Sequence, residues 1–289
     1  MSKFGENIFM LIVGIVAIFS LLREIKNNKR FLGILTFLTR IPIKVNVGFD
    51  EDFHKGLIYF PSVGFILGVL YFIITYISVK VFGYYIGTVI FLISQCILTG
   101  GLHLDGVGDT FDGIYSYRDK DRILEIMKDS RLGTNALLAI LFLVLLKLGF
   151  VFSIISKNVY YPLVLAPVFG RLAIVFACYK NKSPRENGMG NVFINKVTES
   201  QIASVIASTL GITLFTLLLN LIFGFVDILH GSVIGYNTLF VIILFILVRI
   251  YTEYISNIIG GITGDILGCI CELSELLYLI FIYMGVYKW

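Results

Sequence analysis

The stretch 84-YYIGTVIFLISQCILTGGLHLDGVGDTFDGIYS-116 joins two very different kinds of sequence with no linker between them. Its first sixteen residues are mainly apolar and are typical of a helix that spans a membrane. The seventeen that follow hold three aspartates, one histidine and five glycines. The fold must therefore be one that places several acidic side chains at the end of a membrane helix.

The composition of the whole chain predicts an all-α, polytopic membrane protein. Of its 289 residues, 57% are hydrophobic and only 15% are charged, and the mean hydropathy is +0.91. These values lie far outside the range of ordinary soluble domains. At roughly 20 residues per crossing, the chain supplies about seven or eight transmembrane helices, which leaves no room for a separate soluble domain.

Eight apolar segments are long enough to cross or nearly cross a membrane. They lie near residues 8–22, 57–80, 84–104, 135–156, 160–179, 201–224, 237–255 and 273–287. The segment 31–42 is too short, and we expect it to form an interfacial or re-entrant helix.

Two units are predicted along the chain. Residues 1–30 form an extra N-terminal helix and a basic linker, and this helix is retained because no small-residue cleavage site follows it. Residues 31–289 form a single membrane-embedded catalytic domain.

The basic residues are distributed unevenly between the two sides of the predicted bundle. Counting crossings puts the loops 43–56, 105–134, 180–200 and 256–272 on one face, together with 23–30. That face holds fifteen Lys and Arg residues and the opposite face four. By the positive-inside rule the loop-rich face is cytoplasmic, in a prokaryotic cytoplasmic (inner) membrane.

Three aspartates follow the spacing of one helical stripe. Asp105, Asp109 and Asp112 stand at i, i+4 and i+7, so a helix brings their carboxylates to one face. Bare anions so close repel one another, and a cation would neutralise them. Oxygen ligands without cysteine favour Mg²⁺, with Mn²⁺ as a substitute. The alternative is a solvated helix end that is rich in aspartate.

Basic residues follow the aspartates closely. Arg118, Lys128 and Arg131 are within reach of the same surface and are candidates for binding phosphate oxygens. A divalent cation combined with Arg and Lys is the apparatus of phosphoryl transfer. The alternative is an amphipathic helix that contacts anionic lipids.

A second acidic group lies in 260-GGITGDILGCICELSE-275. Asp265 and Glu272 are again seven residues apart, and we expect them to complete or double the metal site. Glu275 could instead cap the last helix. Farther back in the chain, Arg171 is a candidate for substrate binding or for a structural ion pair with Glu253.

Several phrases together resemble one known family, cobalamin-5′-phosphate synthase, also called adenosylcobinamide-GDP ribazoletransferase. They occur in the order FLTRIPI, FPSVGFILG, GGLHLDGVGDTFDG, RILEIMKDSRLGT, GMGNVFI and GGITGDILG…ELSE, within residues 31 to the C-terminus. Arg40, Gly133 and Asn191 lie within these phrases, and we expect them to bind substrate.

The resemblance implies a reaction and its components. It implies that adenosylcobinamide-GDP reacts with α-ribazole or its 5′-phosphate in a Mg²⁺-dependent step that releases GMP. A partial likeness to CDP-alcohol phosphotransferases, Asp109-x-x-Asp112-Gly113, supports the same reaction type. The general base stays open among His103, Asp112 and Asp265. A histidine beside carboxylates tends to be protonated, which would give His103 an acid or phosphate-binding role.

Two other classes of function remain as alternatives. An ion-coupled transporter would use buried acids on broken helices, although its sites normally lie near the bilayer midplane. A membrane scaffold for other cobalamin-assembly enzymes would need the basic loops but not the aspartate stripe. Apart from substrates, the expected partners are the lipid bilayer and such enzymes, with no nucleic acid.

Overall fold

The computed structural model describes residues 28–43, 52–186, 188–222 and 232–287. Within these ranges the regular structure is helical and no strand is present, so the all-α class is confirmed. The predicted helix 8–22 lies outside the described residues. The α-helices are α2 (Lys29–Leu38), α3 (Phe60–Thr99), α4 (Leu102–Ile114), α5 (Lys120–Ile126), α6 (Thr134–Ile155), α7 (Tyr161–Cys178), α8 (Glu199–Ile222), α9 (Ser232–Ile259) and α10 (Gly264–Ile282). The short 3₁₀ and π elements are η1 (Phe53–Tyr59), η2 (Met189–Val192) and η3 (Tyr283–Tyr287).

Six helices among the described residues are long and apolar enough to cross a membrane. One of them, α3, is a hairpin, because Gly83 interrupts it with φ 83° and ψ 174°. The rings of Tyr71 and Phe91 lie 5.7 Å apart, whereas a straight helix would separate them by about 30 Å. The two arms correspond to the predicted segments 57–80 and 84–104, although the second arm ends at Thr99 and residues 102–104 begin α4. The described part of the bundle therefore contains seven apolar helical segments.

Helix α7 forms the centre of the bundle. Every one of its residues is buried, and α3, α8, α9 and α10 pack around it. Gly64 and Gly68 let α3 approach closely: a Cβ at either position would lie within 2.4 Å of a backbone oxygen of α7. The two glycines of α3 thus let its backbone lie against that of α7, and this close van der Waals packing is what holds helices together in lipid surroundings, where no hydrophobic effect drives them together.

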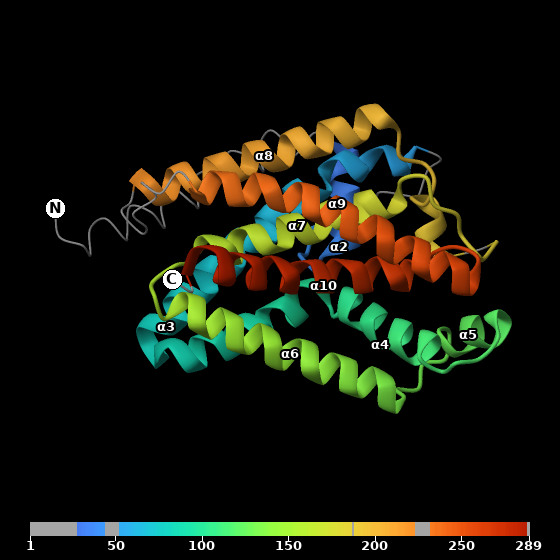
Figure 1. The fold of residues 1–289 in the computed structure, drawn as a ribbon. Helices are drawn as coiled ribbons and strands as arrows, with labels where there is room; N and C mark the ends of the chain where they lie inside the picture. The colour runs from blue at the N-terminus through green and yellow to red at the C-terminus, as the bar shows by residue number, and fades with distance from the viewer. Residues whose placement is uncertain (1–27, 44–51, 187, 223–231, 288–289) are drawn as a thin grey trace.

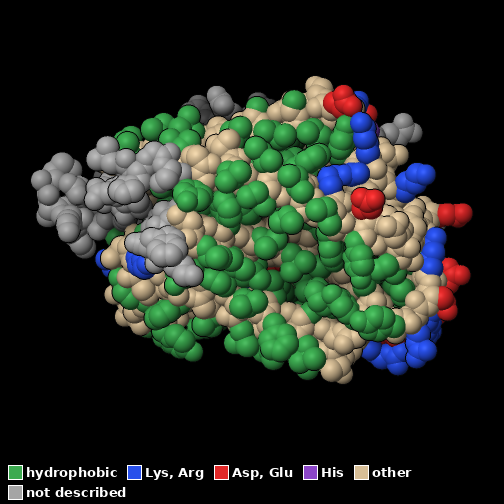
Figure 2. Space-filling view, in the orientation of Figure 1, with side chains coloured by type: hydrophobic (Ala, Val, Ile, Leu, Met, Phe, Trp, Pro, Cys, Tyr) green, Lys and Arg blue, Asp and Glu red, His purple; other side chains and the backbone are tan. Residues whose placement is uncertain are grey.

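The polar connections gather at one end of the bundle (Figure 1). Helices α4 and α5, the segment between α7 and α8, and the turn between α9 and α10 all lie there. Figure 2 shows most of the charged side chains of the visible face at this end, beside a broad green hydrophobic surface. The predicted one-sided arrangement of these loops is therefore present in the fold.

The last long helix begins earlier than the sequence predicts. Its expected span is 273–287, but α10 starts at Gly264, where the Thr263 side chain accepts the backbone N–H of Ile266 as an N-cap. Helix α2 confirms the short helix within 31–42, and its ten residues span only about 15 Å.

Candidate active site

The aspartates lie on a separate short helix at the end of a membrane hairpin. Gly100 and Gly101 both take left-handed conformations, with φ 66° and 72°, which end α3 and allow α4 to start in a new direction. Helix α4 carries Asp105, Asp109 and Asp112, so the predicted helical stripe exists. Asp105 is exposed and the other two are partly buried.

Glycines bring α4 directly against the start of α10. A Cβ on Gly106 would lie 2.5 Å from the backbone oxygen of Asp265, and a Cβ on Gly268 would lie 3.2 Å from the Cα of His103. A side chain on Gly106 would clash with the α10 backbone, and one on Gly268 would be tightly crowded against α4. The packing places Asp265 beside the aspartate stripe, as the sequence predicts.

The charge around Asp109 shows how closely these acids are gathered. Burial, and then the negative charges of Asp105 and Asp265, raise the pKa of Asp109 to about 7. The positive charge of Arg185 opposes this rise. A carboxyl group in such surroundings binds either a proton or a cation readily near neutral pH.

Arg185 reaches this cluster from the segment between α7 and α8. Its Nη1 donates to Asp265 Oδ2 at 3.2 Å, and its Nη2 donates to the Leu124 carbonyl at 3.2 Å. Its Nε is buried and has no hydrogen-bond partner among the described residues. Arg185 therefore fixes the segment against α10 and keeps one buried N–H donor available.

A cavity of about 220 Å³ lies next to the acids. Asp105, Asp265, His103 and Arg185 contribute to its polar wall, and Phe37 to the apolar wall. It is thus bounded by α2, α4, α10 and the segment between α7 and α8. A pocket with one mainly apolar side and a few converging charged groups is typical of a ligand site.

Asp112 is engaged differently from the other two aspartates. Its carboxylate accepts the backbone N–H groups of Gly133 at 2.6 Å and Ala136 at 2.8 Å, at the start of α6. An anion at this position satisfies free N–H groups and interacts favourably with the helix dipole. A Cβ on Gly133 would lie 2.5 Å from the Asp112 oxygens, so this contact needs glycine.

The acids fit a magnesium ion that also has phosphate and water ligands. Among the described residues, no three His, Cys, Asp or Glu side chains are grouped closely enough to enclose a metal by themselves. Mg²⁺ is usually held by one or two carboxylates together with substrate phosphates and water. Asp105, Asp109 and Asp265 are close enough for their charges to influence one another, so they can supply the one or two carboxylates that such a site needs.

Glu272 lies apart from this group. Seven residues of α10 separate it from Asp265, which is about 10 Å along the helix axis. Its carboxylate instead accepts from Lys147 Nζ at 2.6 Å. We therefore leave Glu272 out of the set of acids that fits the metal.

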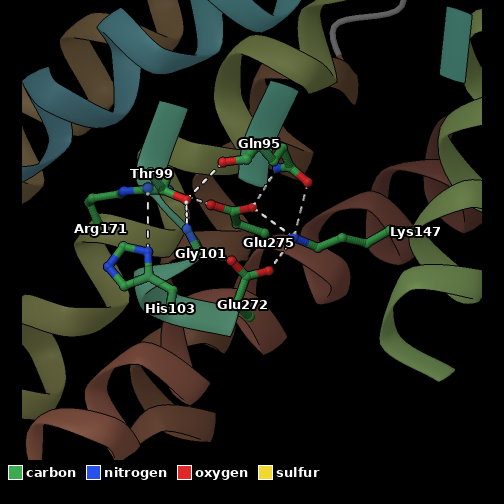
Figure 3. A network of polar contacts seen from close by, with 8 residues as sticks. All are labelled: Gln95, Thr99, Gly101, His103, Lys147, Arg171, Glu272 and Glu275. Atoms are coloured by element: carbon green, nitrogen blue, oxygen red, sulfur yellow. Dashed lines mark hydrogen bonds and ion pairs between the residues drawn. The ribbon is translucent and has the colours of Figure 1, made fainter. Parts of the chain in front are cut away.

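Glu272 belongs to a buried network that Figure 3 shows from close by. Lys147 Nζ also donates to Glu275 Oε2 at 2.9 Å, and Gln95 Nε2 donates to the same oxygen at 3.0 Å. Arg171 Nη1 pairs with the other oxygen, Glu275 Oε1. Arg171 is thus a partner of Glu275 inside the protein.

Two of the alternatives from the sequence are settled by these contacts. Glu253 is exposed on α9, so it is not the partner of Arg171. Glu275 lies within α10 and does not cap it, because Thr263 does.

His103 lies between this network and the cavity. It is buried, and its Nδ1 is 3.5 Å from Arg171 Nη2. Burial and then the adjacent Arg171 charge lower the pKa of His103 to about 3. The expectation of a protonated His103 is therefore wrong, because burial disfavours the charged imidazole and the Arg171 guanidinium outweighs the opposing charge of Glu275.

The remaining candidates for substrate binding are dispersed. Arg118 before α5, and Lys128 and Arg131 after it, are exposed, and Arg131 pairs with Asp129 at 2.5 Å. The side chain of Arg40 lies against Gly100, since a Cβ there would be 2.3 Å from Arg40 Nε.

Asn191 lines the cavity and also holds the loop that carries Arg185. Its side-chain nitrogen donates to the carbonyls of Arg185 at 2.9 Å and Glu186 at 3.0 Å.

Comparisons with known proteins identify the family. The family model described as cobalamin-5-phosphate synthase matches residues 30–283. The chain belongs to this family. A Clostridioides difficile protein named adenosylcobinamide-GDP ribazoletransferase is 50% identical over 259 residues, which cover 90% of this chain and 98% of that protein. Proteins of the same name from Alkaliphilus metalliredigens and Clostridium acetobutylicum are 43% and 40% identical, over 88% and 90% of this chain and 95% and 97% of their own lengths. No solved structure matches.

Membership of the family makes this chain an enzyme of cobalamin biosynthesis, a transferase with apolar helices suited to a membrane. Two residues of this cobalamin-5-phosphate synthase family member, Arg185 and Lys147, make important contacts in the structure but were not among the site residues predicted from its sequence. Arg185 lies in a loop with several other basic residues, and nothing in the sequence distinguishes it from them. Lys147, in contrast, is the single charged residue of the apolar segment 135–156. The position of Lys147 could have predicted a buried ion pair, because an ionisable residue within a membrane helix needs a partner.

Proposed function

We propose that this enzyme is a Mg²⁺-dependent transferase that joins adenosylcobinamide-GDP to α-ribazole or α-ribazole 5′-phosphate. A ribazole hydroxyl attacks the phosphorus that carries the cobinamide side. The bond from that phosphorus to the GMP oxygen breaks, GMP leaves, and the hydroxyl proton is released. The product is adenosylcobalamin or its 5′-phosphate.

The observation that carries this proposal is a cavity lined by Asp105, Asp265 and Arg185, with Asp109 close enough for its charge to interact with all three. Three carboxylates and one guanidinium match the needs of a diphosphate bound with a cation. Asp105, Asp109 and Asp265 would hold Mg²⁺, which supplies charge neutralisation on the phosphate oxygens when bound.

The other residues of the chain have roles in binding and positioning under this proposal. Arg185 would donate its unpaired Nε–H to a phosphate oxygen, as guanidinium groups do in phosphate sites. His103 would contribute as a neutral hydrogen-bonding group, since its low pKa makes it a poor proton carrier near pH 7. Asp112 would hold α6 against α4 and so keep the stripe in place.

We further propose that the charged end faces the cytoplasm. The support is the excess of Lys and Arg in the loops that gather there. The bulky substrates would then enter from the cytoplasm, and the exposed Arg118 and Lys128 would lie on their approach.

The decisive experiment uses purified protein in detergent with adenosylcobinamide-GDP, α-ribazole and Mg²⁺, and measures GMP release. Asp105→Asn and Asp109→Asn should each abolish turnover. The matched control is Asp121→Asn, which removes one negative charge from exposed α5 at the same end. GMP release by the wild type without ribazole, or full activity of both stripe variants, would contradict the proposal.

A further inference from the structure

The buried network inside the membrane domain has one hub, Glu275. Its carboxylate contacts three other helices: α3 through Gln95, α6 through Lys147 and α7 through Arg171. Only 2% of its side chain is exposed. The helix α7 accommodates it through Gly170, where a Cβ would lie 2.9 Å from Glu275 Cγ.

The charges of this network balance within the protein. Lys147 and Arg171 are positive, Glu272 and Glu275 are negative, and each cation has a carboxylate partner. Groups buried this deeply are costly unless they are paired. The arrangement therefore fixes which faces of α3, α6, α7 and α10 meet.

The network is joined to the candidate active site by short rigid connections. Eleven residues of α10, about 16 Å, separate Glu275 from Gly264 at its start, next to Asp265. Arg171 lies between Glu275 and His103, which is two residues before Asp105 on α4. Asp265 lies on α10 and Asp105 lies on α4, and the two helices meet through the backbone of Gly106 and Gly268. A shift of α10 along this contact would therefore move Asp265 relative to Asp105.

We propose that Glu275 is a positioning residue, which fixes α10 against α3, α6 and α7 and thereby sets the place of Asp265 opposite Asp105. This inference rests on the proposed function only for its effect on turnover. Its effect on the helices is independent of substrate and metal. Glu275 itself does not touch the cavity, whose lining includes Asp105 and Asp265.

The matched pair of variants is Glu275→Gln and Glu272→Gln. Each leaves the same excess of one positive charge in the network, and both residues lie on α10 and pair with Lys147. Only Glu275→Gln also breaks the ion pair with Arg171 and weakens the tie to Gln95. A difference between the two variants therefore reports the specific contacts of Glu275 with Arg171 and Gln95, and not the change in network charge.

The first measurement is hydrogen–deuterium exchange of the metal-free protein. Glu275→Gln should speed the exchange of 102–114 and 264–271 by about tenfold, while α8, which does not pack on α4 or α10, stays within about twofold. Glu272→Gln should leave both regions within about twofold of the wild type. Equal effects of the two variants, or a rise that includes α8, would overturn the proposal.

The second measurement is GMP release. Glu275→Gln should lower kcat/KM for adenosylcobinamide-GDP by about tenfold, because the displaced Asp265 and its partner Arg185 both belong to the proposed phosphate site. If the wild type releases no GMP, the proposed function fails while the exchange data still decide the role of Glu275. If Glu275→Gln does not fold, Lys147→Gln/Glu275→Gln restores charge balance, and wild-type exchange at 102–114 in that protein would overturn the proposal.

Discussion

Replacing Asp109 or Asp112 by Asn should change the stability of the metal-free enzyme in opposite directions. The two residues are three positions apart on α4, and both substitutions remove one negative charge and keep the side-chain shape. The structure gives them different surroundings, because Asp109 faces other carboxylates and Asp112 faces backbone N–H groups.

The cost of Asp112→Asn follows from its two hydrogen bonds. An asparagine has one carbonyl oxygen, so it can accept from Gly133 or Ala136 while its NH₂ group faces the other N–H. Loss of a helix cap costs about 0.5–2 kcal/mol. Removal of the charge at the helix N-terminus adds about 0.3–1 kcal/mol. We expect the free energy of unfolding to fall by about 1–3 kcal/mol.

The gain from Asp109→Asn follows from the raised pKa of this carboxyl. A rise from 3.8 to about 7 corresponds to about 4 kcal/mol at 1.36 kcal/mol per pKa unit. Asp109 is only half buried, and screening by solvent reduces this figure to about 1–2 kcal/mol. An uncharged Asn at this position avoids that penalty at pH 8.

The pH dependence of the free energy of unfolding tests separately whether ionised Asp109 destabilises the folded protein. Below about pH 4, Asp109 is protonated in both the folded and the unfolded chain. Between pH 4 and 7 only the unfolded chain loses the proton, so folding stability falls, and the full penalty is present above pH 7. Wild-type protein should therefore gain stability from pH 8 to pH 5.5, and Asp109→Asn should lack this component.

The assay is thermal unfolding in detergent with a chelator at pH 8. At about 2–4 °C per kcal/mol, Asp109→Asn should raise Tm by several degrees and Asp112→Asn should lower it by several degrees. Addition of Mg²⁺ should raise the Tm of wild type and not that of Asp109→Asn. A lower Tm for Asp109→Asn at pH 8, or an unchanged Tm for Asp112→Asn, would refute the reasoning.

Three further predictions concern the metal, the substrate and the topology. Asp265→Asn should raise the Mg²⁺ concentration for half-maximal activity about tenfold or more, because an anionic ligand is lost, and Glu272→Gln should not; equal curves for Asp265→Asn and wild type would contradict this. Arg185→Gln should raise KM for adenosylcobinamide-GDP by about tenfold, from the loss of a charged hydrogen bond, and a KM equal to wild type would exclude a phosphate contact. A membrane-impermeant thiol reagent applied outside intact cells should label Ser156→Cys and not Ser130→Cys, and the reverse pattern would exclude the proposed orientation.

Local spacing was sufficient to predict the aspartate helix. Three residues at i, i+4 and i+7 share a face in any helix, and α4 is a helix. The sequence also predicted that Asp265 lies at the same end, because crossing parity depends only on the number of membrane spans. Both predictions use information that is local or that can be counted along the chain.

Contacts between distant helices were not predictable in this way. Lys147 and Glu275 are 128 residues apart, and nothing in either segment specifies which helix faces which. The role of Asp112 was hidden for the same reason, since its partners Gly133 and Ala136 are backbone groups 21 and 24 residues away. The start of α10 was missed because Gly264, Asp265 and Gly268 interrupt an apolar pattern that tertiary packing later completes.

The two groups of charges in this enzyme are subject to opposite physical requirements. Deep in the bundle, each carboxylate is matched by a cation of the protein, so no net charge is buried and no ligand is needed. At the end of the bundle, Asp105, Asp109 and Asp265 face one another with Arg185 as the opposing charge. That surplus of negative charge can persist only where water, a proton or a cation reaches it. The imbalance therefore belongs at the surface end, and the same rigid helices that carry the balanced network keep it in place.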